Sequence, residues 1–248
     1  MGACVKIDSI AGDWLKITTV DGYRAWVNSG SVVSDSTMVK MWHSAPKAIV
    51  VSRHALVYNI SGAKICELPM GSTVSTDKDK SFTSPSEKIE ISLPDNRVGF
   101  ISTQDIVPES IITKHFVPNG NSIISLAKEF IGMPYVWGGG SAEGFDCSGL
   151  SQFVYKMHGV LLPRNASAQA ECGITVGKSG EYNNLRAGDL LFFGKERVTH
   201  VAIYCDNGEF IHASSANGRV SINSLDPSSS IYYRNASQHL FSKRIIDK

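Results

Sequence analysis

A cysteine at the start of a predicted helix is the first candidate for chemistry in this chain of 248 residues. Asp146 has the side chain of a helix N-cap, and Cys147 and Ser148 form the first turn of an amphipathic segment. Unpaired backbone N–H groups and the helix dipole at that end favour the thiolate, the nucleophilic form of cysteine. We expect Gly144 and Gly149 to leave room there for the backbone of a substrate. The competing interpretation is a small buried cysteine without a chemical role.

Two histidines of a predicted β-hairpin are candidates for the base that such a thiol needs. His200 lies on a strand predicted from alternating residue character, and a turn follows that strand. A three-residue loop that ends with a left-handed Gly208 would pair Cys205 with Glu209, and His212 would then lie on the same face as His200. A two-residue turn would send His212 to the opposite face. The first arrangement, which we expect, brings the two imidazoles together.

These side chains could act as a nucleophile, a base and an orienting group. In this hypothesis Cys147 attacks a carbonyl carbon, His200 takes the thiol proton and passes it to the leaving amine, and His212 fixes the tautomer of His200. The backbone N–H of Cys147 and the hydroxyl of Tyr135 would bind the oxyanion. A zinc site built from the same cysteine and histidines is the alternative, but their spacing matches no common ligand pattern. We therefore expect neither a metal nor another cofactor.

The composition excludes several other classes of function. The formal net charge is +1, which gives no reason to expect nucleic acid or an anionic membrane as a partner. No apolar run reaches the roughly 18 residues that span a bilayer. The five cysteines are an odd number without a C-x-x-C pair, so they predict neither a disulfide scaffold nor a zinc ribbon.

The N-terminal part of the chain predicts short strands that occur in two copies. Residues 16–27 align without gaps on residues 90–101, and each copy has a strand, a D-G or D-N turn and a second strand. Residues 48–69 supply a further strand and a loop before the second copy only. We therefore expect the first copy to be truncated at its N-terminus or to be completed in an unusual way.

Aromatic residues of these two copies are expected to have different environments. Trp14, Trp26 and Phe100 are predicted to lie in the apolar core of each copy. Tyr23 aligns with Arg97 and is therefore expected at the surface. Residues 77–81 alternate in charge sign and are predicted to form a solvated loop.

The C-terminal part of the chain predicts helices first and strands afterwards. A helix is expected from Asn121 or Ser122 to Gly132, and the Cys147 helix follows. Strands are then predicted over 190–193, 199–204, 209–213 and 220–222. This order indicates an α+β fold with helices packed on an antiparallel sheet.

The motifs around the candidate site, taken in order, resemble one family. They are Tyr135-x-Trp137-Gly138-Gly139, Phe145-Asp146-Cys147-Ser148-Gly149-Leu150, Leu162-Pro163-Arg164, residues 186–193 (RAGDLLFF), residues 199–204 (THVAIY) and Phe210-Ile211-His212-Ala213. Over about residues 120–245 the chain resembles the NlpC family, which are papain-like cysteine peptidases of bacterial cell-wall peptides. The resemblance implies a nucleophile at Cys147, a base at His200 and an orienting residue at His212.

The N-terminal copies resemble bacterial SH3-like β-barrels, which commonly recognise peptidoglycan or peptides. The expected organisation is a first, truncated SH3-like module over residues 1–40 and a second over 41–108. A linker over 109–120 and a papain-like peptidase domain over 121–248 follow.

The resemblance also implies a substrate and the residues that bind it. The expected reaction is hydrolysis of the γ-D-glutamyl–diamino acid bond of peptidoglycan stem peptides that carry a free N-terminal L-alanine. Asp146 would pair with the substrate ammonium group, Ser148 would hydrogen-bond the D-glutamate, and Tyr23 is a second candidate for the ammonium site. The residues implied to contact the substrate are Tyr135, Trp137, Asp146, Ser148, Tyr23 and Arg164.

Two other functions are compatible with the same residues. A thiol-dependent acyl transferase or amidase would pass the acyl group to an amine, and a non-catalytic cell-wall-binding protein would use the SH3-like modules alone. A cell-wall substrate favours the cell envelope, either periplasmic or secreted, with cytoplasmic recycling of muropeptides as the alternative. The choice between diaminopimelate and lysine as the third residue stays open.

Overall fold

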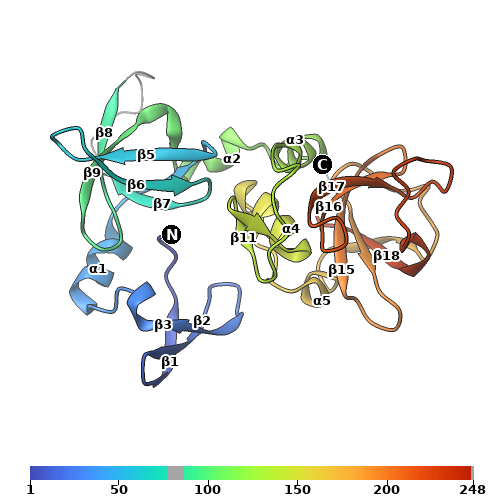
Figure 1. Ribbon diagram of the computed structural model, residues 1–248, viewed down its shortest axis with the longest axis horizontal. Coiled ribbons are helices and arrows are strands. Elements are labelled where there is room, and N and C mark those ends of the chain that lie inside the picture. The colour runs from blue at the N-terminus through green and yellow to red at the C-terminus, as the bar shows by residue number, and fades with distance from the viewer. Residues whose placement is uncertain (77–86, 247–248) are drawn as a thin grey trace. The chain divides into compact units, whose positions relative to one another are not determined.

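The computed structural model describes residues 1–76 and 87–246, which divide into two compact units (Figure 1). Unit 1 covers Met1–His115 and unit 2 covers Phe116–Lys248. The charged loop predicted over residues 77–81 lies outside the described residues.

Unit 1 consists of short strands and a few short helices. Its elements are β1 (Lys6–Ala11), β2 (Trp14–Thr18), β3 (Arg24–Asn28), η1 (Ser29–Ser31), α1 (Ser36–Ser44), β4 (Lys47–Val50), β5 (His54–Tyr58), β6 (Lys64–Pro69), β7 (Thr73–Thr76), β8 (Lys88–Ser92), β9 (Val98–Ser102), η2 (Thr103–Asp105), β10 (Ile106–Pro108), η3 (Glu109–Ile111) and α2 (Ile112–His115). Part of the segment predicted as a linker is therefore helical, and Ile112 within it is buried.

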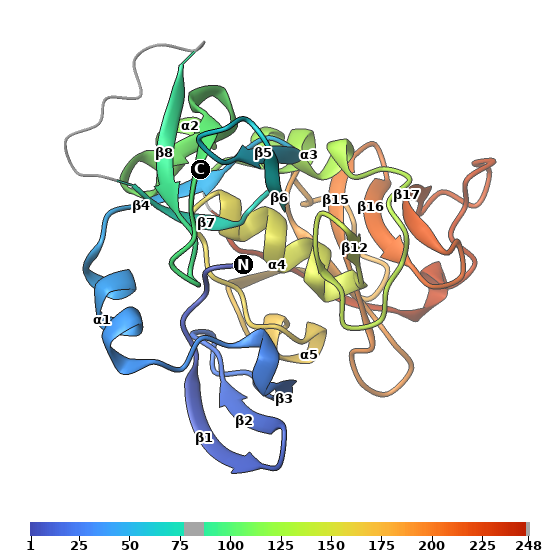
Figure 2. The same cartoon turned by 60° about the vertical axis from the view of Figure 1, so that its left-hand side comes forward.

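The two sequence copies form hairpins with the same register. In β2–β3 Ile17 lies opposite Ala25, and in β8–β9 Ile91 lies opposite Gly99, 74 positions further along in both strands. Each hairpin continues into a 3-10 helix, η1 or η2. Among the described residues, the first hairpin belongs to a three-stranded sheet β1-β2-β3, visible in Figure 2, and the second to a seven-stranded sheet β10-β4-β7-β8-β9-β5-β6.

Two predicted core aromatic residues of the first copy lie at the surface instead. Trp14 is 52% exposed and Trp26 is 50% exposed. The register explains this result, because Leu15 and Ile17 are buried on one face of β2, and strand alternation turns Trp14 to the other face. The core of the second copy comes from aliphatic residues such as Val57 and Ile101. The interpretation of both copies as SH3-like barrels stays a prediction.

Unit 2 contains the candidate site. Its elements are α3 (Gly120–Glu129), β11 (Gly140–Ser141), β12 (Gly144–Phe145), α4 (Cys147–Met157), α5 (Ala166–Gln169), β13 (Ile174–Lys178), β14 (Leu190–Phe193), β15 (His200–Asp206), β16 (Glu209–Ser214), β17 (Arg219–Ser224), η4 (Ala236–Gln238) and β18 (His239–Arg244). In the described part of the unit, six strands form an antiparallel sheet in the order β13-β18-β14-β15-β16-β17, and β11 pairs with β12 in a separate two-stranded sheet.

The helix α4 packs against β15 and β16, the two strands that carry the candidate histidines (Figure 2). Its buried face includes Leu150, Val154 and Met157, whose spacing of three or four residues predicts a helix with one apolar side. Phe153 packs against Phe130 and Phe145 in edge-on and tilted contacts. These contacts fix the helix, and with it the position of Cys147, against the sheet.

Candidate active site

The two histidines of the hairpin contact each other through their ring nitrogens. Nε2 of His200 lies 2.7 Å from Nδ1 of His212, with the rings nearly perpendicular. His212 is fully buried, whereas His200 is partly exposed. The two side chains therefore share one face of the sheet, as the alternation of the strands predicts.

The turn that achieves this arrangement differs from the predicted one. Asp206 pairs with Glu209, so the turn has two residues, and both Asn207 and Gly208 have positive φ. The predicted pairing of Cys205 with Glu209 is therefore wrong. Such a turn alone would place the histidines on opposite faces.

A β-bulge corrects the register. The pairing shifts between Tyr204 and Asp206, so one extra residue of β15 is left unpaired, and Tyr204 lies opposite Phe210. Ala202 then falls opposite His212, which restores the predicted face. The Asn-Gly pair favours the tight turn, and the bulge supplies the residue that the predicted three-residue loop would have contained.

The thiol of Cys147 lies at the N-terminus of α4. Burial raises its pKa, while the backbone N–H groups of Val201, Ser148 and Cys147 itself oppose the rise. Burial therefore outweighs these N–H groups, and the net shift of the Cys147 pKa favours the thiol over the thiolate. The contact with the Val201 N–H places the sulfur beside the beginning of β15, next to His200 in the chain.

Both histidines are neutral at pH 7. Burial, and to a smaller extent the neighbouring His212, lower the pKa of His200 to about 3. Burial also lowers the pKa of His212 to about 4, although the hydrogen bond to the side-chain oxygen of Asn223 opposes the fall. A neutral imidazole has a lone pair that can accept a proton, which is the first requirement for a general base.

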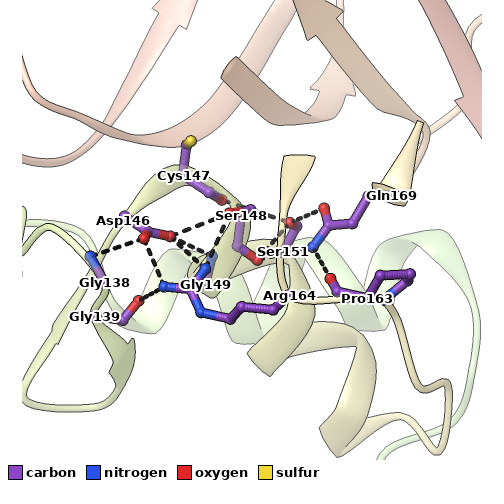
Figure 3. A network of polar contacts seen from close by, with 10 residues as sticks. All are labelled: Gly138, Gly139, Asp146, Cys147, Ser148, Gly149, Ser151, Pro163, Arg164 and Gln169. Carbon is purple, nitrogen blue, oxygen red and sulfur yellow. Dashed lines mark hydrogen bonds and ion pairs between the residues drawn. The ribbon is translucent and has the colours of Figure 1, made fainter. Parts of the chain in front are cut away.

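The side chain of Asp146 joins three parts of the site (Figure 3). It caps α4 by accepting the N–H of Gly149 at 2.7 Å, as the sequence predicts, and it also accepts the N–H of Gly138 at 3.0 Å. Arg164 binds both of its oxygens, at 2.6 and 2.9 Å. Figure 3 shows the sulfur of Cys147 pointing away from this network, toward the strands of the sheet.

Ser148 and Gln169 complete the network below the thiol. The Ser148 hydroxyl donates to Asp146 at 3.3 Å and accepts from Arg164 at 3.0 Å, and the side chain is buried. The fully buried Gln169 donates to the carbonyl oxygens of Ser148 and Pro163 and accepts from a serine one turn into α4. The loop that carries Arg164 is thereby tied to the first turn of the helix.

The glycines around Cys147 allow another segment of the same chain to pack closely against them. A β-carbon on Gly149 would lie 2.0 Å from the carbonyl oxygen of Gly139, and one on Gly144 would lie 2.5 Å from the side chain of Val136. The prediction that these positions admit a substrate backbone is therefore wrong. They allow the 136–139 loop to lie directly on the start of α4.

The aromatic candidates occupy different positions. Tyr135 is partly buried, and burial raises its pKa, as would a negative charge on Cys147. Trp137 is 88% exposed on the same loop. Tyr23 is exposed at the β2–β3 turn of unit 1. The contacts of these three residues with a substrate stay predictions.

Two residues near the histidines were missed by the sequence interpretation. The ring of Tyr233 packs perpendicular to His212, with centroids 5.1 Å apart, and lies 6.1 Å from His200. The side-chain oxygen of Asn223 lies 2.9 Å from Nε2 of His212. Ser221 and Asn223 alternate with the apolar Val220 and Ile222, and this pattern could have indicated a polar face toward His212.

Replacing Arg164 by Met is expected to lower the free energy of unfolding by about 3 kcal/mol, because it leaves the nearly buried Asp146 carboxylate without its cation. The side chains of this pair are only 15% and 11% exposed. Arg164→Lys should recover part of the loss, since lysine restores the charge but not the two parallel hydrogen bonds. Urea denaturation monitored by circular dichroism measures the effect.

The matched control for this variant is Arg97→Met, which removes an exposed arginine from an ion pair with Asp95. Exposed pairs of this kind contribute about 0–1 kcal/mol. Equal losses from both variants would show that the Asp146–Arg164 pair has no special structural role.

None of the helices in residues 1–76 and 87–246 is long and apolar enough to cross a membrane. The histidine, cysteine, aspartate and glutamate side chains of these residues form no group of three or more that could hold a metal ion.

Comparisons with known proteins concern both the sequence and the fold. Residues 132–240 match the model of the NlpC/P60 family. Dipeptidyl-peptidase 6 of Lysinibacillus sphaericus is 29% identical over 233 residues, which are 91% of this chain and 82% of that protein. A gamma-D-glutamyl-L-lysine dipeptidyl-peptidase of Bacillus cereus is 41% identical over 109 residues, or 42% of this chain and 32% of that protein. The peptidoglycan endopeptidase RipB of Mycobacterium tuberculosis is 33% identical over 138 residues, covering 50% and 52% of the two chains.

A comparison of the fold gives one high score for a solved structure that covers nearly the whole chain. The crystal structure of an NlpC/P60 family protein from Bacillus cereus ATCC 10987 has a TM-score of 0.82 and is 23% identical, covering 98% of this chain and 79% of that one. This likeness confirms the predicted α+β fold. This chain spans less than two thirds of the length of the Bacillus cereus dipeptidyl-peptidase and of RipB.

Proposed function

Residues 132–240 belong to the NlpC/P60 family and form a peptidase domain, and we propose that this chain hydrolyses the γ-D-glutamyl–diamino acid bond of peptidoglycan stem peptides. The observation that carries the proposal is the contact between His200 and His212 beside the helix that Cys147 begins. The names of the relatives support the substrate class, because one is a γ-D-glutamyl-L-lysine dipeptidyl-peptidase and another a peptidoglycan endopeptidase.

The first chemical step forms a thioacyl-enzyme. The sulfur of Cys147 attacks the γ-carbonyl carbon of the D-glutamyl residue, and its proton moves to His200. Nε2 of His200 contacts His212, so Nδ1 is the nitrogen left to take that proton. His200 then gives the proton to the leaving amine, the C–N bond breaks, and the diamino acid departs.

Water completes the reaction. It attacks the thioester carbonyl while His200 takes one of its protons, and collapse of the intermediate releases L-Ala-γ-D-Glu and restores the thiol. In both steps, the negative oxygen would be bound by the backbone N–H of Cys147 at the helix N-terminus and by the hydroxyl of Tyr135. The effect of a charge on Cys147 on the pKa of Tyr135 supports the Tyr135 hydroxyl as the second hydrogen-bond donor.

The contacts of Asp146 favour a structural role over ammonium binding. In the described structure, five donors reach its two oxygens, from Gly138, Ser148, Gly149 and both terminal nitrogens of Arg164. A carboxylate has about four lone-pair sites, so these bonds saturate it. We propose that Asp146 and Arg164 position the nucleophile, and that the exposed indole of Trp137 offers the ammonium group a cation–π surface.

The product mass spectrum tests the function. Incubation with L-Ala-γ-D-Glu-diaminopimelate is expected to release L-Ala-γ-D-Glu, and the lysine analogue is included because one relative is named for that bond. The same peptide acetylated at its amine is expected to react at least tenfold more slowly if the free ammonium group is recognised. Absence of cleavage in every peptide, with the thiol reduced, would overturn the proposal.

Added hydroxylamine separates hydrolysis from acyl transfer. A hydrolase yields the free dipeptide as its main product at low amine concentration, whereas a transferase yields the hydroxamate and little dipeptide. Binding to cell-wall fragments without any cleavage would favour the non-catalytic alternative. A cell-wall substrate suits a location in the cell envelope, with cytoplasmic recycling of released peptides as the alternative.

A further inference from the structure

A chain of hydrogen bonds continues from the two histidines to a third side chain. Nε2 of His200 faces Nδ1 of His212 at 2.7 Å, and Nε2 of His212 faces Oδ1 of Asn223 at 2.9 Å. A neutral imidazole has one nitrogen that donates a proton and one that accepts. If His212 donates in one of these two hydrogen bonds, it must therefore accept in the other.

The orientation of the Asn223 amide is set by its other contacts. Its Nδ2 donates to the carbonyl oxygen of Ile231 at 2.8 Å, and its Oδ1 accepts from the side-chain amide of Asn217 at 3.0 Å. A flipped amide would place its NH₂ group against another NH₂ group and its oxygen against a carbonyl oxygen. The group that faces His212 is therefore an oxygen, which can only accept.

An obligate acceptor next to His212 determines both tautomers. His212 carries its proton on Nε2, so its Nδ1 has a lone pair and accepts from His200. The proton of His200 is then on Nε2, and its Nδ1 is free to take the proton of Cys147. We propose that Asn223 is a positioning residue whose side-chain oxygen, acting through His212, holds His200 in the tautomer that can act as the base.

Apart from Asn223, the described neighbours of His200 and His212 include several aromatic rings. His200 lies against the rings of Phe193 and Tyr233, and His212 lies against those of Phe210 and Tyr233. The Tyr233 phenol, whose ring packs against both histidines, and Cys147, whose charge raises the pKa of Tyr233, are titratable groups from other elements. The contact with Asn223 is the one that opposes the effect of burial on His212.

The inference rests on the proposed peptidase chemistry, but one of its readouts does not require activity. ¹⁵N NMR of the histidine rings reports which nitrogen carries the proton. In the wild type we expect the Nε2–H form for both His200 and His212. In Asn223→Leu we expect a mixture of tautomers, together with a fall in kcat of about 100-fold and a KM within about twofold of the wild type.

Asn223→Asp keeps the acceptor and adds a charge. We expect it to preserve the Nε2–H tautomers and most of kcat, and to move the acid limb of the pH profile upward by about one pH unit, because a carboxylate favours the imidazolium form. Ile222→Val, at the neighbouring position of the same strand, is the control for local structure and is expected to leave the tautomers unchanged. Circular dichroism confirms folding of each variant.

Three experimental outcomes test the proposed role of Asn223. Unchanged tautomers and an unchanged kcat in Asn223→Leu would overturn the inference, as would an acid limb of Asn223→Asp at the wild-type pH. If the wild type cleaves no peptide but shows the Nε2–H tautomers that Asn223→Leu loses, the proposed function fails and the role of Asn223 stands.

Discussion

Replacing Cys147 by Ala is expected to abolish release of L-Ala-γ-D-Glu from the stem tripeptide, with a loss in kcat of at least about 10⁴-fold. The neighbouring Ser148 hydroxyl is not expected to replace the thiol as nucleophile, because it is buried and bonded to Asp146 and Arg164. The fold is expected to survive, since the substitution removes a single atom at a partly exposed position. Chromatographic assay of the dipeptide measures the loss.

The matched control is Cys205→Ala, which removes the buried thiol of the same domain that lies outside the site. It is expected to lower stability by the cost of a small cavity and to leave kcat near the wild-type value. Residual turnover of Cys147→Ala within tenfold of the wild type would contradict the assignment of the nucleophile.

Replacing His200 by Ala is expected to lower kcat by about 10³-fold with little change in KM, because general-base removal acts on the chemical step and not on binding. Alkylation of Cys147 by iodoacetamide should slow as well, since the thiol then lacks the acceptor for its proton. His158→Gln is the control, because His158 is also buried but is bonded to Ser122 and Val154. It is expected to change stability and not kcat.

The pH dependence of kcat/KM tests whether the two histidines are neutral in the resting enzyme. Burial lowers the pKa of His200 to about 3 and that of His212 to about 4, so both rings stay neutral as the pH falls from 7 to 5. The acid limb of kcat/KM is therefore expected well below pH 6.5, the ordinary pKa of histidine. An acid limb at or above pH 6.5 in the wild type would show that the resting base is more exposed to solvent than the structure indicates.

Local sequence patterns predicted the parts of the site that depend on neighbouring residues. The N-cap role of Asp146 follows from residue type and position alone, and the structure confirms it. The shared face of His200 and His212 follows from strand alternation, although the bulge at Cys205 that produces it was not expected. A bulge shifts the register by one residue, and the sequence indicates only the face that must be buried.

Contacts between segments that are distant in sequence could not be predicted from local sequence patterns. Arg164 approaches Asp146 across a loop, and the Gly139 carbonyl occupies the space above Gly149. Neither contact leaves a periodic signal in the sequence. The strand β18 was missed for a similar reason, since its partners β13 and β14 are distant in sequence and its register with β14 is interrupted by a bulge.

The most direct test of a thioacyl-enzyme on Cys147 is the mass of the protein itself during turnover. Wild-type enzyme mixed with excess L-Ala-γ-D-Glu-diaminopimelate and quenched in acid within milliseconds is expected to gain the mass of one L-Ala-γ-D-Glu acyl group. Fragmentation is expected to locate that group on the peptide that contains Cys147. Product formation without any acylated protein, or an acyl group carried by another residue, would contradict the account.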